Sequence, residues 1–215
     1  MSADRRGLPF VVAAPSGTGK TTVCRAVVDR DEGIAFSISH TTRAPREGER
    51  DGVDYHFVTS EEMLSLVEAG VFLEHAEYAG NIYGTSWRAL REPLERGLDL
   101  LIEIEVQGAR QVREQMEEAR FIFLLPPSMK VLEERLRARG TDSDDEVARR
   151  LSVADLELRA IEIFDYAVVN DDLETAIGSV QEIIRLERAG RSDDARSRHG
   201  REVVWARWQT SEDRS

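Results

Sequence analysis

The chain has 215 residues, a hydrophobic fraction of 41% and a formal net charge of -12 at pH 7. These values predict one compact unit with a sizeable core, and the acidic balance excludes a general nucleic-acid-binding surface. The sequence contains no apolar run long enough to span a membrane, and a single cysteine, Cys24, without an apolar leader indicates a cytoplasmic protein.

Apolar runs typical of buried strands alternate with helical segments along the chain. Strands are expected at residues 10–14, 34–39, 100–105, 121–125 and 166–170, and core helices are expected to begin at Lys20, Gln107 and Leu173. This alternation favours an α/β fold with a parallel sheet that helices cover on both faces.

Three other segments differ in character from this alternating core. Residues 40–87 are polar and rich in turns, and the spacing of Thr59 and Glu62 predicts a capped helix at 60–69. Residues 128–159 are helical and rich in arginine, with a first helix capped by Ser128 and ended by Gly140. Residues 190–215 lose apolar periodicity, which predicts a mobile tail.

The segment after the first expected strand has the composition of a phosphate-binding P-loop. It follows the pattern G-x-x-x-x-G-K-[ST], with alanine in place of the first glycine, and comprises Ala14, Pro15, Ser16, Gly17, Thr18, Gly19, Lys20, Thr21 and Thr22. Between a strand and a helix, the backbone N–H groups of such a loop bind anionic oxygens. We expect Lys20 to reach the outer phosphates and Thr21 to ligate Mg²⁺. The simpler alternative is a strand-to-helix turn that happens to contain glycine and lysine.

A second candidate anion site follows the strand expected at 34–39. Arg43 and Arg46 flank Pro45, which stiffens the loop, and two guanidinium groups suit a phosphate monoester because each binds two oxygens. Tyr55 and Tyr83 would add neutral donors. Taken alone, this segment is equally compatible with a solvated charged loop.

The arginine-rich segment 128–159 offers a third group of cations. Arg135 and Arg139 are four residues apart and therefore share a helix face, and Arg150 follows on the next helix. Because acidic residues lie nearby, an exposed pair of helices linked by Glu–Arg ion pairs is the alternative to a phosphate-binding lid.

The residues from Ser39 to Phe57 read S-x-T-T-R-x-P-R-x-G-E-x-x-G-x-D-Y-x-F, which resembles the signature of guanylate kinases. The resemblance continues through 72–76, 80–85, 102–108, 126–128, 135–141, 149–151 and 169–172, and so covers about residues 8–188 in the order of that family. It implies a P-loop NTPase-type core (8–38, 88–127 and 160–189), a small mixed GMP-binding insertion (39–87) and a helical lid (128–159).

The resemblance also implies roles for single residues. The guanine pocket would be lined by Ser39, Glu74, Thr85 and Glu105, the acceptor phosphate would be held by Arg43, Arg46, Tyr55 and Tyr83, and ATP would be contacted by Arg135, Arg139, Arg150 and Asn170. Guanine presents two neighbouring N–H donors that a carboxylate such as Glu74 accepts, whereas adenine presents no such pair. Glu105 stands where many relatives have aspartate.

The expected reaction is the transfer of a phosphoryl group from ATP, with Mg²⁺, to GMP or dGMP in purine nucleotide metabolism. Lys20, Arg46, Arg139 and Arg150 would stabilise the charge on the transferred group, and the ionised acceptor phosphate needs no general base. One alternative is a sugar-phosphate kinase, which has no use for Ser39, Glu74 and Thr85 together. The other is a non-catalytic guanylate-kinase-like interaction module, in which the P-loop is typically eroded.

Overall fold

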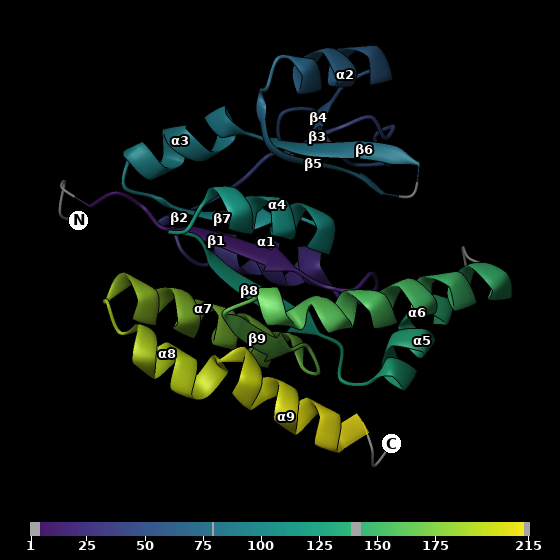
Figure 1. The fold of residues 1–215 in the computed structure, drawn as a ribbon, viewed down its shortest axis with the longest axis vertical. Helices are drawn as coiled ribbons and strands as arrows, with labels where there is room; N and C mark the ends of the chain where they lie inside the picture. Colours follow the sequence, from purple (N-terminus) through teal and green to yellow (C-terminus); the bar gives the residue numbers. More distant parts are fainter. Residues whose placement is uncertain (1–4, 79, 139–142, 213–215) are drawn as a thin grey trace.

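A five-stranded parallel sheet forms the centre of the computed structural model, which describes residues 5–78, 80–138 and 143–212 (Figure 1). The strand order is β2-β7-β1-β8-β9. The strands are β1 (Pro9–Ala13), β2 (Ile34–Phe36), β7 (Asp99–Glu103), β8 (Arg120–Leu125) and β9 (Tyr166–Val169). Apart from Asp99, Glu103 and Arg120 at strand ends, their residues are mostly apolar, because both faces of a parallel sheet are buried. The α/β fold predicted from the sequence is confirmed.

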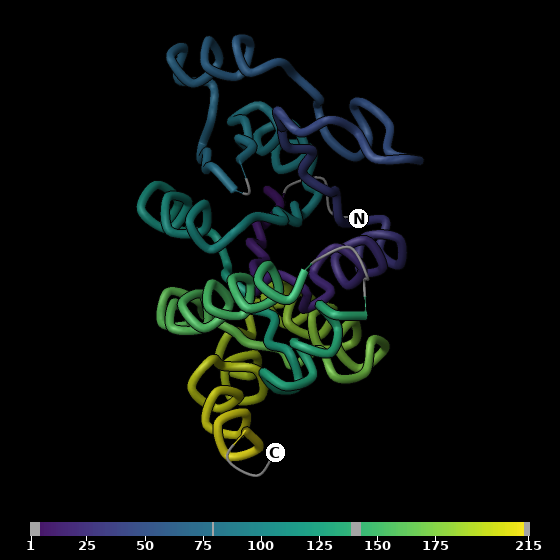
Figure 2. The backbone as a smooth tube through the Cα atoms, turned by 90° about the vertical axis from the view of Figure 1, so that its right-hand side faces the viewer, coloured from purple at the N-terminus to yellow at the C-terminus, as the bar shows by residue number. Residues whose placement is uncertain are grey.

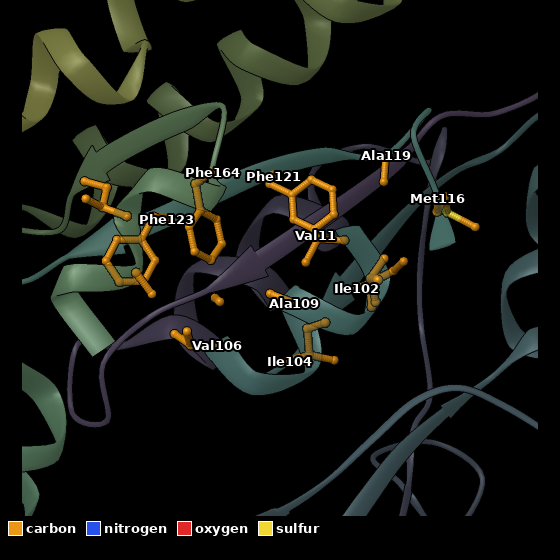
Figure 3. Close-up of a cluster of buried hydrophobic side chains, with 14 of the residues drawn as sticks. Val11, Ile102, Ile104, Val106, Ala109, Met116, Ala119, Phe121, Phe123 and Phe164 are labelled. Atoms are coloured by element: carbon orange, nitrogen blue, oxygen red, sulfur yellow. The ribbon is translucent and has the colours of Figure 1, made fainter. Parts of the chain in front are cut away.

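Successive side chains of β1 enter two different cores. Val11 and Ala13 belong to one cluster, drawn in Figure 3, with α3 (Trp87–Glu95) and α4 (Val106–Gln115). Phe10 and Val12 belong to the opposite cluster, with α1 (Lys20–Asp29) and α7 (Leu173–Arg188). This alternation is the period of two expected for a strand buried on both faces.

A second, smaller sheet lies at one end of the molecule (Figures 1 and 2). Its order is β4-β3-β6-β5, with antiparallel pairs β3–β6 and β5–β6 and a parallel pair β3–β4. The elements of this part are β3 (His40–Thr41), β4 (His56–Phe57), α2 (Ser60–Glu68), β5 (Phe72–Tyr78) and β6 (Asn81–Ser86). The capping box predicted at Thr59 and Glu62 is present. The strand expected at 34–39 stops at Phe36, because residues 37–39 leave the first sheet and lead into the second.

Two helices, α5 (Met129–Ala138) and α6 (Asp144–Leu158), form the arginine-rich segment, and a 3-10 helix, η1 (Arg159–Ile163), returns the chain to β9. The pair has a small core of its own, made by Leu132, Leu136, Val147 and Ala154. The Ser128 hydroxyl caps α5 by accepting from Val131 N at 3.1 Å. Gly140, the expected end of this helix, lies outside the described residues.

The sequence predicted a mobile tail at 190–215, and this prediction is corrected by two helices, α8 (Ser192–His199) and α9 (Arg201–Glu212). Both helices lie against the core at the end of the molecule opposite the second sheet (Figure 2). Ala195 and Trp208 are buried in the two main clusters. So few apolar residues leave no periodicity to detect, and their burial depends on tertiary contacts. Within the described part of the chain, no helix is long and apolar enough to cross a membrane.

Candidate active site

The P-loop predicted from the sequence connects β1 to α1 and needs glycine at two positions. Gly17 and Gly19 have φ of 94° and 93°, a backbone conformation that side chains disfavour. A Cβ atom on Gly19 would also lie 2.7 Å from Asn170 Nδ2. Ala14, which replaces the first glycine of the pattern, is buried in the cluster beside β1. The loop therefore keeps its tight path although its first glycine is absent.

Lys20 is the first residue of α1 and points to the end of β7. Its Nζ donates to Ile104 O at 2.6 Å and to Glu105 Oε1 at 3.1 Å. Burial alone lowers the pKa of Lys20, but the carboxylates of Glu105 and Glu103 outweigh burial and raise the pKa above its usual value. Lys20 therefore carries its positive charge throughout the neutral pH range. The neighbouring Thr21 hydroxyl donates to Glu103 Oε1 at 2.5 Å.

Three residues predicted to line the guanine pocket form one buried hydrogen-bonded chain. Glu74 on β5 and Thr85 on β6 are paired in register, and Thr85 Oγ1 donates to Glu74 Oε1 at 2.6 Å. The Thr85 oxygen lies 3.0 Å from Ser39 Oγ, so Ser39 is left to donate to Thr85. Glu74 is 3% exposed, and burial raises its pKa to about 7, although hydrogen bonds from Thr85 oppose the rise.

Gly108, to which the sequence analysis gave no role, makes room for this carboxylate. A Cβ atom at Gly108 would lie 2.4 Å from Glu74 Oε2. The two residues are far apart in sequence, and α4 brings the glycine against β5. The only sequence signal for Gly108 was its place in the motif at 102–108.

The loop with the two arginines is held together by Glu49. Arg43 Nη2 donates to both oxygens of that carboxylate, at 2.8 and 3.0 Å, and Arg46 N donates to Glu49 Oε2 at 2.7 Å. The Arg43 guanidinium also lies 5.4 Å from the centre of the Tyr55 ring, which meets the Tyr83 ring edge-on at 6.0 Å. The predicted acceptor-phosphate residues are thus neighbours.

Two predicted arginines of α5 and α6 bond to the P-loop region. Arg150 Nη2 donates to Ser16 Oγ at 2.7 Å. Arg135 Nη2 donates to Asn170 O at 3.0 Å, and Asn170 Nδ2 in turn donates to Thr18 O at 2.7 Å. Arg139 lies outside the described residues.

Two ionisable residues beside Ser16 were missed by the sequence analysis. Burial raises the pKa of Tyr78, whose hydroxyl bonds to Ser16. Burial also raises the pKa of Glu157 to about 7, and this carboxyl faces the backbone N–H of Ser16. Glu157 follows Arg150 by two turns of α6, so both residues share the helix face that meets the P-loop. That spacing was the available signal.

A cleft of about 330 Å³ extends from the P-loop to the second sheet. Its lining contains most of the predicted site residues: Ala14, Pro15, Ser16, Gly17, Gly19, Lys20, Thr21, Thr22, Ser39, Arg43, Arg46, Tyr55, Glu74, Tyr83, Glu105 and Arg150. Thr85 supports this lining through Glu74. Thr18, Arg135 and Asn170 are not part of the lining and are linked to one another by hydrogen bonds beside the P-loop. Lys20 of the P-loop, Arg43 and Arg46 of the second loop and the buried carboxyl group of Glu74 thus face one space.

A glycine-containing loop at the carboxyl end of β1, a charged lysine after it and a cleft that reaches a separate sheet are the features of a P-loop phosphotransferase. A model of the guanylate kinase family matches residues 6–187. The chain is 52% identical over 176 residues to a guanylate kinase of Nitratidesulfovibrio vulgaris, covering 82% of this chain and 85% of the relative. It is 50% identical over 192 residues to a guanylate kinase of Neisseria gonorrhoeae, covering 89% and 94%.

The crystal structure of guanylate kinase from Anaplasma phagocytophilum has the same fold, with a TM-score of 0.71 at 37% identity, covering 85% of this chain and 87% of that one. The chain belongs to the guanylate kinase family. The family resemblance predicted from the sequence is confirmed, and neither the sugar-phosphate kinase nor the non-catalytic module is favoured.

Proposed function

We propose that the protein transfers the γ-phosphoryl group of ATP to GMP, and also to dGMP, in a reaction that requires Mg²⁺. The observation that carries this proposal is the buried chain Ser39–Thr85–Glu74, which lies in the same cleft as Lys20. The ionised form of a carboxyl group buried this deeply needs hydrogen-bond donors, and an incoming guanine supplies two of them.

The acceptor pocket selects guanine because guanine presents two N–H donors that the carboxylate of Glu74 can accept. The ionised carboxylate of Glu74 accepts from the ring N–H and the amino group of guanine, and the hydroxyls of Ser39 and Thr85 complete the polar wall. Adenine leaves the buried carboxylate unpaired, and sites of this kind discriminate by about 10⁴–10⁵. Ser39, Glu74 and Thr85 would all contact the base, so the proposal includes dGMP as well as GMP.

The donor side consists of the P-loop and two neighbouring oxygen groups suited to a hydrated Mg²⁺ ion. The Thr21 hydroxyl and the Glu103 carboxylate lie 2.5 Å apart, and both are the hard oxygen donors that Mg²⁺ prefers. Thr21 would hold the ion directly, and Glu103 and Glu105 would orient its water ligands. Bound Mg²⁺ would supply positive charge to the β- and γ-phosphates of ATP.

Transfer relies on positioning and on positive charge. The acceptor is an ionised phosphate oxygen, so no side chain needs to remove a proton. Arg43, Tyr55 and Tyr83 hold the acceptor phosphate, and Arg43 exchanges its bonds with Glu49 for bonds to that phosphate. Lys20 and Arg46 stabilise the transferred group together with Arg150 and Arg139, while Arg135 and Asn170 contact ATP.

An ADP-release assay with GMP, dGMP, AMP, UMP and ribose bisphosphate as acceptors tests the proposal. We expect turnover with GMP and dGMP only, and its loss when EDTA removes divalent cations. Comparable turnover with ribose bisphosphate would indicate a sugar-phosphate kinase. Binding of GMP without any turnover would indicate an interaction module.

A further inference from the structure

The C-terminal helix α9 contacts the short connection that leads from the central sheet into α5. Strand β8 ends at Leu125 and α5 begins at Met129, so residues 126–128 form the whole connection. Trp208 is 7% exposed, and its Nε1 donates to Pro126 O at 2.6 Å. Glu212 Oε1, in the last turn of α9, accepts from Met129 N at 2.8 Å.

These contacts stabilise the first turn of α5. The first N–H groups of a helix have no acceptor within the helix and carry partial positive charge. Ser128 Oγ accepts from Val131 N, and the Glu212 carboxylate accepts from Met129 N. The start of α5 is therefore capped by two side chains, one of which belongs to a helix more than eighty residues later in the chain.

Helix α5 in turn packs directly on the P-loop. A Cβ atom placed on Gly17 would lie 2.9 Å from Leu136 Cδ2 and 3.0 Å from Leu132 Cδ1, so the two leucines leave no room for a side chain there. Arg135, on the same helix, donates to Asn170 O and contacts Thr18 O at 3.5 Å. A displacement of α5 would therefore be transmitted to the loop that holds the phosphates.

The other end of α9 is fixed to the central sheet. Gly200 forms a bridge with Tyr166 of β9, and Arg201 Nη1 donates to Phe164 O at 2.8 Å. Trp205 stacks on Trp208, with ring centres 4.9 Å apart. Figure 1 shows α9 running from β9 towards α5. The helix lies beyond residues 6–187, which the family model matches.

We propose that α9 is a brace that positions α5 against the P-loop, with Trp208 and Glu212 as positioning residues for the ATP half of the site. This inference rests on the proposed function, from which it takes the binding of ATP at the P-loop. It places no part of the brace near the acceptor pocket. Loosening the brace is therefore expected to weaken the binding of ATP and to leave the binding of GMP unchanged.

Single substitutions in the full-length enzyme separate this role from a general one in stability. Trp208→Phe keeps a large ring but loses the N–H donor, and Glu212→Ala loses the cap. Glu212→Gln keeps an acceptor oxygen and is the conservative rescue. Glu202→Ala is the matched control, because it removes a carboxylate from the same helix whose side chain is 88% exposed.

The readouts are the dissociation constant for MgATP by titration calorimetry, the KM values for ATP and GMP, and the thermal midpoint. For Trp208→Phe and Glu212→Ala we expect the dissociation constant for MgATP to rise about threefold to tenfold, which is the effect of one lost hydrogen bond. The KM for GMP should not change. Glu212→Gln and Glu202→Ala should stay near the wild type.

The proposal would be overturned if the affinities for ATP and GMP fell equally, or if neither variant changed the affinity for ATP. The calorimetric titration needs no turnover, so it tests the brace even in a variant with low activity. Failure of the wild-type enzyme to phosphorylate GMP would instead contradict the proposed function. The two failures are therefore distinguishable.

Discussion

Replacing Glu74 with glutamine is expected to stabilise the protein at alkaline pH while disabling the acceptor pocket. Burial raises the pKa of Glu74 from 4.5 to about 7, and the hydrogen bonds from Thr85 only partly oppose the rise. The folded chain therefore binds this proton more tightly than the unfolded chain. The resulting contribution to stability is fully present below pH 4.5 and is lost as the pH rises through 7.

The structure sets the size of the effect. At 1.36 kcal/mol for each pKa unit, a rise from 4.5 to about 7 corresponds to about 3 kcal/mol. Glutamine stays neutral, so the free energy of unfolding of Glu74→Gln relative to wild type should increase by up to about 3 kcal/mol between pH 4.5 and pH 8. Urea unfolding at both pH values measures this difference, and Glu77→Gln, an exposed position on the same strand, is the control.

The same variant should lose activity towards GMP. Two hydrogen bonds to a charged acceptor, each worth about 1.5–3 kcal/mol, correspond to a loss of about 10²–10⁴-fold in kcat/KM for GMP. The affinity for ATP should not change. A stability difference that is equal at both pH values would refute the reasoning about burial. A kcat/KM for GMP within tenfold of the wild type would refute the role of the carboxylate.

Substitutions at three further positions test other parts of the cleft. Lys20→Ala should lower kcat by about 10²–10³-fold with GMP affinity retained, because it removes positive charge at the transferred group; a near-normal kcat contradicts this. Thr85→Val breaks the hydrogen-bonded chain from Ser39 to Glu74 and should raise the KM for GMP about tenfold, whereas Thr85→Ser should keep the KM near the wild-type value. Equal KM values for the two variants would count against a role of the chain. Gly108→Ala places a Cβ atom 2.4 Å from Glu74 Oε2 and should weaken GMP but not ATP, as parallel titrations would reveal.

The central sheet and the P-loop were predictable because their signals are local. Apolar runs of five or six residues mark the strands, and Gly17 and Gly19 occupy positions where φ is positive. The acceptor residues were predicted from a family signature. The structure then brings Ser39, Glu74 and Thr85 into contact because β5 and β6 are paired in register.

Features that depend on contacts between distant segments were not predictable. Residues 192–212 are rich in arginine, aspartate and serine, and their helices are stabilised by a few buried residues such as Trp208. Gly108 has a role only because α4 lies against β5. Similarly, Glu157 acquires its raised pKa only where α6 meets the P-loop.

Binding of a bisubstrate ligand, adenosine and guanosine joined through five phosphates, tests most directly whether donor and acceptor sites face one another. The structure predicts one ligand per chain, bound more tightly than ATP or GMP alone and displaced by either nucleotide. Glu74→Gln and Lys20→Ala should each weaken it. A ligand that binds no more tightly than GMP, or that only one of the two nucleotides displaces, would contradict a shared cleft.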